Sequence, residues 1–274
     1  MFFCRHLAAV LAVCAGSLFL CTGGASARDI PFQPGEEVKY DVRWQMYKAG
    51  EAQIQVMPFT EVKGRRSYHF QFRAQSNAFI DKLFKVRDSA EGFVADDFSG
   101  STGYEYRGEG KKKKEIRVDF FPDTNRVVYS NFDEPRKPLE IPEGCFDPVS
   151  SYFKMRLMDL EIGQTLSFPI TDGKKYFFQK GEIVKKEKIT IKSVAYDTVV
   201  VVPHVTHFSG VFKESKDPTV RVWLTDDERQ IPVRIKIRIA VGSIYFDLSS
   251  YKPGKPASPP PANGGYVHGG ILYL

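Results

Sequence analysis

The chain has 274 residues and carries 39 Lys and Arg against 33 Asp and Glu, which gives a formal net charge of +6 at pH 7. This surplus is compatible with attraction to an anionic membrane surface but falls well short of the charge that nucleic-acid binding needs, so we expect no nucleic-acid partner. A chain of this length can bury enough apolar surface to fold without disulfides.

Residues 1–27 have the pattern of a secretory signal peptide. Arg5 precedes an apolar run at residues 7–21, and small residues follow at Ala25 and Ala27, where signal peptidase needs them. Because the run is shorter than the roughly 20 residues of a membrane-spanning helix, we expect cleavage near Ala27 and a periplasmic location, with outer-membrane association as an option.

Export would leave Cys145 as the one remaining cysteine, so no internal disulfide can form. A thiol that packs as a small hydrophobic group is the simplest interpretation of this residue. Lipid attachment at Cys14 or Cys21 is disfavoured, because a bulky residue precedes each of them.

Strand patterns dominate between Val38 and Tyr251, where we count about a dozen candidates separated by turn-forming residues. The short spacing between them favours antiparallel hairpins over parallel strands, which need long crossovers. Clear examples are YHFQFRA at residues 68–74, EIRVDFF at 115–121, EKITIKSV at 187–194 and DTVVVVPHV at 197–205.

One main helix is predicted at residues 147–160. Asp147 is a suitable N-cap, Pro148 suits the first helical position, and apolar residues then recur at helical spacing. A weaker helical turn is predicted at residues 77–84. The fold class is therefore all-β, a strongly curved antiparallel sheet or open β-barrel with this helix on its concave side.

A single domain is predicted over residues 28–252, with halves at 30–131 and 147–251 joined by a Pro-rich connection. Both halves open on a similar amphipathic strand, which either reflects a duplicated unit or is a chance match between two ordinary strands. The Pro- and Gly-rich tail at residues 253–274 is predicted to be disordered.

No catalytic, metal or nucleotide motif accompanies these strands, so we expect neither an enzyme nor a cofactor. His204 and His207 would point to opposite faces of a strand, which argues against a zinc site. The run of Lys111, Lys112, Lys113 and Lys114 is predicted to be a solvated hairpin tip that could contact an anionic membrane surface.

Within the segment at residues 231–248, branched aliphatic residues from Val233 to Val241 alternate with cations and predict extended backbone with one apolar face. Together with the high aromatic content, this pattern suggests an apolar pocket rather than catalysis. The hypothetical lining residues are Phe70, Phe72, Phe79, Phe84, Val222, Leu224, Ile235, Ile237 and Ile239.

Four segments, taken in order, resemble domain-of-unknown-function family 3108 of exported Gram-negative envelope proteins. They lie at residues 32–56, 77–94, 147–156 and 220–248. The last segment is also similar to periplasmic lipoprotein carriers of the LolA and LolB type, and this resemblance implies a curved antiparallel sheet around a hydrophobic cavity. The family resemblance implies no activity.

We therefore expect a non-catalytic carrier or binding module for a hydrophobic or lipid-like envelope ligand. The alternative is a structural or assembly factor of the envelope that binds a protein or glycan partner. An empty concave interior would favour the carrier, whereas a filled interior with an exposed aromatic or basic patch would favour the assembly factor.

Overall fold

The computed structural model describes residues 30–83, 85–110, 113–204, 219–239 and 242–255. The predicted signal peptide and nearly all of the predicted disordered tail lie outside these residues. None of the helices in the described part of the chain is long and apolar enough to cross a bilayer.

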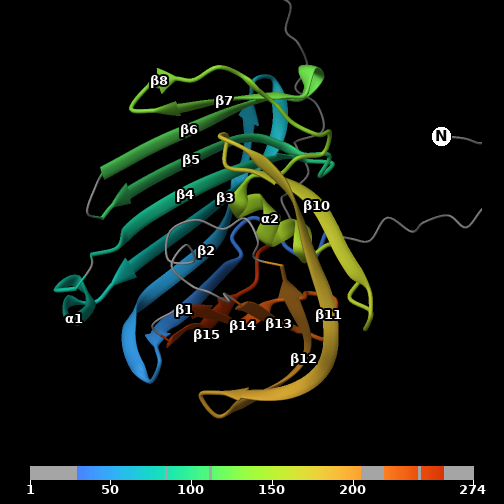
Figure 1. The fold of residues 1–274 in the computed structure, drawn as a ribbon. Helices are drawn as coiled ribbons and strands as arrows, with labels where there is room; N and C mark the ends of the chain where they lie inside the picture. The colour runs from blue at the N-terminus through green and yellow to red at the C-terminus, as the bar shows by residue number, and fades with distance from the viewer. Residues whose placement is uncertain (1–29, 84, 111–112, 205–218, 240–241, 256–274) are drawn as a thin grey trace, which may run out of the picture.

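In the described residues, fifteen antiparallel strands form a single sheet that curves strongly but does not close (Figure 1). Consecutive strands pair as hairpins from β1 to β7 and again from β10 to β15, and β15 returns to pair with β1. The strands are β1 (Glu37–Trp44), β2 (Tyr47–Val62), β3 (Arg65–Ser76), β4 (Arg87–Ala95), β5 (Ser101–Glu109), β6 (Lys113–Phe121), β7 (Arg126–Asn131), β8 (Glu134–Pro135), β9 (Leu139–Glu140), β10 (Thr165–Thr171), β11 (Tyr176–Ile191), β12 (Val194–Pro203), β13 (Thr219–Thr225), β14 (Pro232–Ile239) and β15 (Gly242–Lys252).

Within the part of the chain that the structure describes, three short helical segments interrupt the strands. They are α1 (Ala78–Asp81), the 3-10 turn η1 (Pro122–Thr124) and α2 (Pro148–Met155). α2 lies inside the curve of the sheet, between the β2–β7 side and the β10–β13 side (Figure 1). It is the main helix of the fold, as predicted.

The two ends of the sheet approach each other on one side of α2. Phe146, just before α2, forms a parallel bridge with Ile170 on the edge strand β10. The turn after β10 reaches β6 and β7, where the Lys174 ammonium lies 4.6 Å from the ring centroid of Tyr129. A Cβ atom on Gly173 would lie 2.7 Å from a methyl group of Val118, so the turn requires glycine there. The open sheet is therefore nearly barrel-like.

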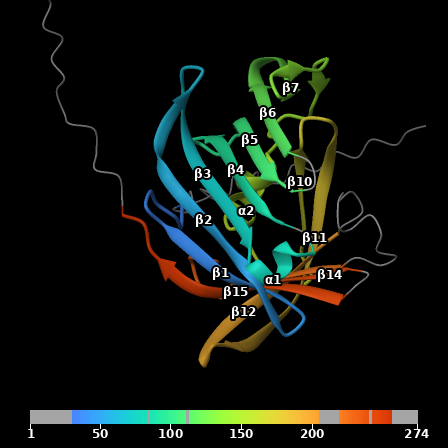
Figure 2. The ribbon, with the colours of Figure 1, turned by 90° about the vertical axis from the view of Figure 1, so that its left-hand side faces the viewer.

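The β11–β12 hairpin extends below the rest of the sheet and curls under β13, β14 and β15 (Figures 1 and 2). Its tip residue Lys192 forms an ion pair with Asp41 on β1. The indole nitrogen of Trp223 donates a 2.7 Å hydrogen bond to Glu187 on β11. The hairpin thus covers part of the sheet face that points away from α2.

The observed register confirms the alternation predicted for β13 and β14. Val222 pairs with Ile235 and Val220 with Ile237, whereas Arg221 pairs with Lys236 and Trp223 with Arg234. Aliphatic side chains therefore share one face and the cations share the other with Trp223.

The predicted end of the main helix at residue 160 is wrong, because α2 ends at Met155. The backbone N–H groups of Leu157 and Met158 bond to carbonyls three residues earlier, which tightens the last turn. Gly163, with φ of 86°, then lets the chain turn into β10. The weaker helical turn predicted at residues 77–84 is α1, capped by Asn77.

Candidate functional site

An apolar pocket of about 350 Å³ lies between α2 and the inner face of β10–β14. α2 contributes residues at helical spacing, and β10 and β12 contribute alternate residues, so each of these elements presents one face to the same space. The apolar side chains of the lining are Pro148, Tyr152, Met155, Leu166, Phe168, Ile170, Phe177, Val201, Pro203, Val222 and Ile235.

The opposite face of α2 is packed without space for a ligand. Phe153 stacks on Phe70 of β3 with ring centroids 3.7 Å apart, and both side chains are almost fully buried. Phe32 packs edge-on against both of these rings. This aromatic cluster fills the β2–β4 side of the interior and fixes the orientation of the pocket-facing side.

Asp147 holds the beginning of α2 in place. Its carboxylate accepts hydrogen bonds from the backbone N–H groups of Val149 at 2.8 Å and Ser150 at 2.9 Å, which are otherwise unpaired at a helix start. Ser101 of β5 donates to the same carboxylate at 2.6 Å, and the Ser150 hydroxyl donates as well. Burial raises the pKa of Asp147 to about 6 despite these four donors.

The first turn of α2 also sits unusually close to β4. A Cβ atom on Gly92 would lie 2.6 Å from the Asp147 carboxylate and 2.8 Å from the Ser150 hydroxyl. Glycine at this strand position therefore permits the close approach of helix and sheet.

Arg156 anchors the end of α2 in the interior. Its guanidinium is fully buried and forms an ion pair of 2.5 Å with Glu36, and it also donates to the carbonyl of Arg229 at 3.0 Å. The guanidinium lies 5.1 Å from the ring centroid of Phe32. The ion pair ties α2 to the segment before β1, and the carbonyl contact ties it to the β13–β14 turn.

The two phenols at the inner wall, Tyr40 and Tyr152, stay neutral at physiological pH. The Tyr40 and Tyr152 hydroxyls lie 3.0 Å apart, and Tyr40 donates to the carbonyl of Pro232 at 2.8 Å. Burial raises the pKa of Tyr152 to about 12. Because Tyr152 also lines the pocket, that wall carries no ionised phenol.

The structure separates the predicted lining residues into different environments. Val222 and Ile235 line the pocket. Phe70 and Leu224 are fully buried in the packed core, and Phe72 and Ile237 are partly buried beside it. Phe79, by contrast, is 61% exposed on α1. Phe84 and the Ile239 side chain lie outside the described residues.

The lysine run at residues 111–114 precedes the strands β10–β14 in the sequence and does not belong to the lining of the pocket. Lys113 and Lys114 are exposed at the start of β6, and Lys111 and Lys112 lie outside the described residues. The hairpin from β5 to β6 agrees with the predicted position of a tip in this region.

Sequence reasoning missed most of the pocket wall. Helical spacing places Tyr152 on the apolar face of the helix without assigning it to a site, and it does not single out Met155. The β10 and β11 residues Leu166, Phe168 and Phe177 are not among the predicted lining residues. Their signal is the alternation of TLSFPI at residues 165–170, which resembles any half-buried strand.

Among the described residues, no group of three or more His, Cys, Asp or Glu side chains could hold a metal ion. The ring of His69 lies 2.7 Å from Glu91 and stacks on Phe93, with no nucleophile in this contact. His204 is described, but His207 is not. Cys145 is a buried free thiol, and burial raises its pKa to about 12, which disfavours the reactive thiolate.

Solved structures that resemble this chain include two proteins of low sequence identity. The β-barrel-like protein of domain of unknown function DUF1849 from Brucella abortus has a TM-score of 0.49 and 9% sequence identity, covering 81% of this chain and 98% of that one. The hypothetical protein CT021 from Chlamydia trachomatis has a TM-score of 0.38 and 7% identity, covering 85% of this chain and 94% of that one. No curated protein matches the chain.

At the level of sequence, the family described as protein of unknown function DUF3108 matches residues 39–249. This range begins in β1 and ends in β15, so it contains α2 and every strand that lines the pocket. The chain therefore belongs to the DUF3108 family.

Proposed function

We propose that this protein is a non-catalytic periplasmic binding module that holds the apolar chain of a lipid-like envelope molecule in the pocket beside α2. The observation that carries the proposal is the pocket itself. It is lined mainly by aliphatic and aromatic side chains from six elements, whereas the other side of the same helix is packed solid.

The size of the pocket suits part of an amphiphile. Its volume of about 350 Å³ lies at the lower end of the range of roughly 300–1,000 Å³ that is typical of small-molecule sites. Each buried methylene contributes about 0.8 kcal/mol, so eight methylenes would supply about 6 kcal/mol before the costs of ordering the ligand.

The polar residues of the lining suit the head of such a molecule. Lys180 is exposed and Gln179 half-buried, and both belong to the lining on β11. A carboxylate or phosphate headgroup could therefore remain near solvent and beside a cation while its chain lies against Phe168, Val222 and Ile235.

A titration with a fluorescent fatty acid tests this proposal. Ile235→Trp would fill the pocket from β14, and we expect it to weaken binding at least tenfold. Val184→Trp is the matched control, because Val184 is exposed on β11 and does not belong to the lining. Absence of saturable binding to the unmodified protein, or equal binding by both variants, would contradict the proposal.

The alternative function is an envelope assembly factor that binds a protein or glycan partner on its outer face. The packed aromatic cluster on the β2–β4 side supports it, because a filled interior needs no ligand there. Crosslinking in intact envelopes distinguishes the two functions: a partner recovered equally with the unmodified protein and with Ile235→Trp would favour the assembly factor.

A further inference from the structure

Four large apolar side chains project into solvent at one end of the sheet. Met46 is 79% exposed, Tyr47 63%, Phe79 61% and Leu83 58%. We call this set the turn patch. Met46 lies in the turn between β1 and β2, and Tyr47 is the first residue of β2. Phe79 belongs to α1, and Leu83 follows it. Figure 2 shows these two elements together on the side that faces the viewer.

Hydrogen bonds join the two halves of the turn patch. The side-chain amide of Asn77, the N-cap of α1, donates to the carbonyl of Lys48 at 2.6 Å. Its backbone N–H donates to the carbonyl of Ala49 at 2.8 Å. α1 and the β1–β2 turn are therefore attached to one another, and their apolar side chains form one surface.

The backbone that carries the turn patch is anchored. Gln45 adopts a left-handed conformation with φ of 55°, and its N–H donates to the carbonyl of Ser243 on β15 at 2.8 Å. On α1, Ile80 is almost fully buried, and Asp81 forms an ion pair with Arg87 of 2.7 Å. The apolar side chains point outward from fixed turns, so their exposure is not the fraying of a loose end.

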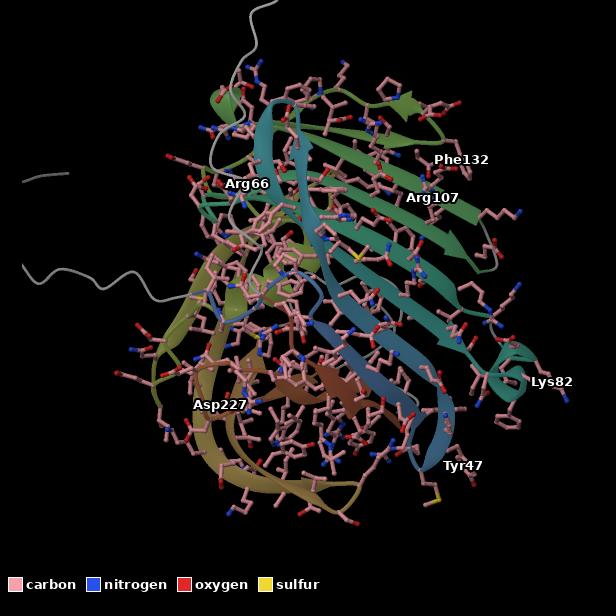
Figure 3. All side chains as sticks on the ribbon, turned by 180° about the vertical axis from the view of Figure 1, so that it is seen from behind. Tyr47, Arg66, Lys82, Arg107, Phe132 and Asp227 are labelled. Carbon is pink, nitrogen blue, oxygen red and sulfur yellow. The ribbon has the colours of Figure 1, made fainter. Side chains whose placement is uncertain are left out.

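Cations without an acidic partner within the described residues flank the turn patch. Lys82 is exposed between Phe79 and Leu83, and Figure 3 shows it at the same end of the molecule as Tyr47. Arg238 is exposed on β14, where it pairs with Ser243, the residue that also bonds to Gln45. The neighbouring cations Lys48 and Lys85 form ion pairs with Glu51 and Glu109 instead.

The turn patch joins two elements that are separate in the sequence. Among the described residues, the other large apolar side chains that are exposed lie elsewhere: Phe121, Phe132 and Ile162, then Tyr176, Phe178 and Val184 on β11, and Val194 at the start of β12. A soluble protein rarely gathers large apolar side chains in one exposed patch unless the patch binds something. Apolar side chains beside uncompensated cations match a bilayer interface, in which acyl chains lie beneath anionic headgroups.

We propose that the turn patch docks the protein on an anionic lipid bilayer, with Met46, Tyr47, Phe79 and Leu83 entering the interface and Lys82 and Arg238 contacting lipid phosphates. Tyr47 suits this position because tyrosine rings concentrate at the headgroup level of membranes. This docking goes beyond ligand binding in the pocket, because it depends on different residues and holds whether or not the pocket binds an acyl chain.

Vesicle sedimentation tests the docking. The processed protein, purified from cells that express the full chain, is mixed with phosphatidylcholine vesicles that contain about a third phosphatidylglycerol, and separately with pure phosphatidylcholine. We expect stronger binding to the anionic vesicles, and weaker binding as the salt concentration rises.

Two variants of the turn patch separate its apolar and cationic parts. Met46→Ser with Phe79→Ser removes apolar contacts, and we expect at least a tenfold loss of binding to anionic vesicles. Lys82→Gln with Arg238→Gln removes two cations, each of which contributes roughly fivefold near an anionic surface, so we expect a loss of roughly 30-fold. All four side chains are exposed, and the unfolding midpoints should remain unchanged.

The control variants are Phe132→Ser with Ile162→Ser for the apolar part and Lys113→Gln with Lys114→Gln for the charges. Because all variants share the same termini, any contribution of the terminal residues is common to them. Binding that the turn-patch variants leave intact, or that only the Lys113 and Lys114 variant abolishes, would overturn the proposal. So would absence of binding to anionic vesicles, including the case in which the patch binds a protein instead.

Discussion

The two faces of α2 differ in what they contact, although one short helix carries both. Val149, Phe153 and Arg156 meet the core, where Phe153 stacks on Phe70 and Arg156 pairs with Glu36. Pro148, Tyr152 and Met155 border the pocket. The packed face holds the helix in position, and the position of the helix keeps the pocket open.

Breaking the buried ion pair should have the largest effect on stability. Glu36→Gln leaves the Arg156 guanidinium buried without its counter-charge, so we expect the free energy of unfolding to fall by about 3–5 kcal/mol. Urea denaturation measures it. The control Glu51→Gln removes one of the two acidic partners of exposed Lys48 and should leave the free energy of unfolding nearly unchanged. Equal losses would contradict an anchoring role for Arg156.

Truncating one side chain on each face of α2 compares how much the two faces contribute to the free energy of unfolding. Phe153→Ala removes a buried ring from a packed cluster, and we expect a loss of about 3–5 kcal/mol. Met155→Ala removes a side chain that borders space, so the loss should be about 2 kcal/mol at most. Urea denaturation of both variants gives the difference. A larger loss for Met155→Ala would mean that the pocket face is the one that holds the helix.

The cap of α2 should make stability depend on pH in the opposite direction from an ordinary ion-paired carboxylate. Burial raises the pKa of Asp147 from the model-compound value of 3.8 to about 6, so between these values the folded state binds more protons than the unfolded state. The contribution of Asp147 to the free energy of unfolding therefore falls by about 2 kcal/mol as the pH rises from 4 to 6.

Asp147→Asn isolates this contribution, because asparagine retains a capping oxygen but does not titrate. The difference in unfolding free energy between the unmodified protein and the variant should change with pH across this window and level off above about pH 7. A difference that is constant from pH 4 to 7, measured by urea denaturation, would show that the pKa of Asp147 is not raised.

The smallest of these effects concerns the contact between α2 and β4. Gly92→Val places methyl groups where Asp147 and Ser150 approach the strand, and we expect a loss of about 1–3 kcal/mol from overpacking. Gly110→Ala is the control, because a Cβ atom there meets its nearest neighbour at an ordinary 3.7 Å. Thermal unfolding should give a lower midpoint for Gly92→Val than for Gly110→Ala. A Gly92→Val variant with the same unfolding midpoint as the unmodified protein would mean that α2 does not sit this close to the sheet.

The sequence predicted the packed framework better than the pocket, for physical reasons. Strand alternation and the Asp147–Pro148 helix start are local signals, so the curved antiparallel sheet and the beginning of α2 could be predicted. The end of α2 could not, because it depends on Glu36, which lies 120 residues from Arg156 in the chain.

Strand alternation also could not predict which residues of one strand face line the pocket. Val222 and Leu224 alternate identically in the sequence, yet Val222 borders the pocket and Leu224 is buried in the core. Which of them meets open space depends on where α2 crosses the sheet, and a strand pattern carries no information on that crossing. Phe79 failed as a lining candidate for a related reason, since α1 is too short to bury more than Ile80.

The central claim is that an apolar chain occupies the pocket beside α2. Native mass spectrometry of protein purified gently from its own envelope tests it most directly. We predict an amphiphile bound to the unmodified protein at equal stoichiometry, lost from Ile235→Trp and retained by Val184→Trp. An unmodified protein that repeatedly carries no bound amphiphile, or an Ile235→Trp variant that carries as much as the control, would contradict the claim.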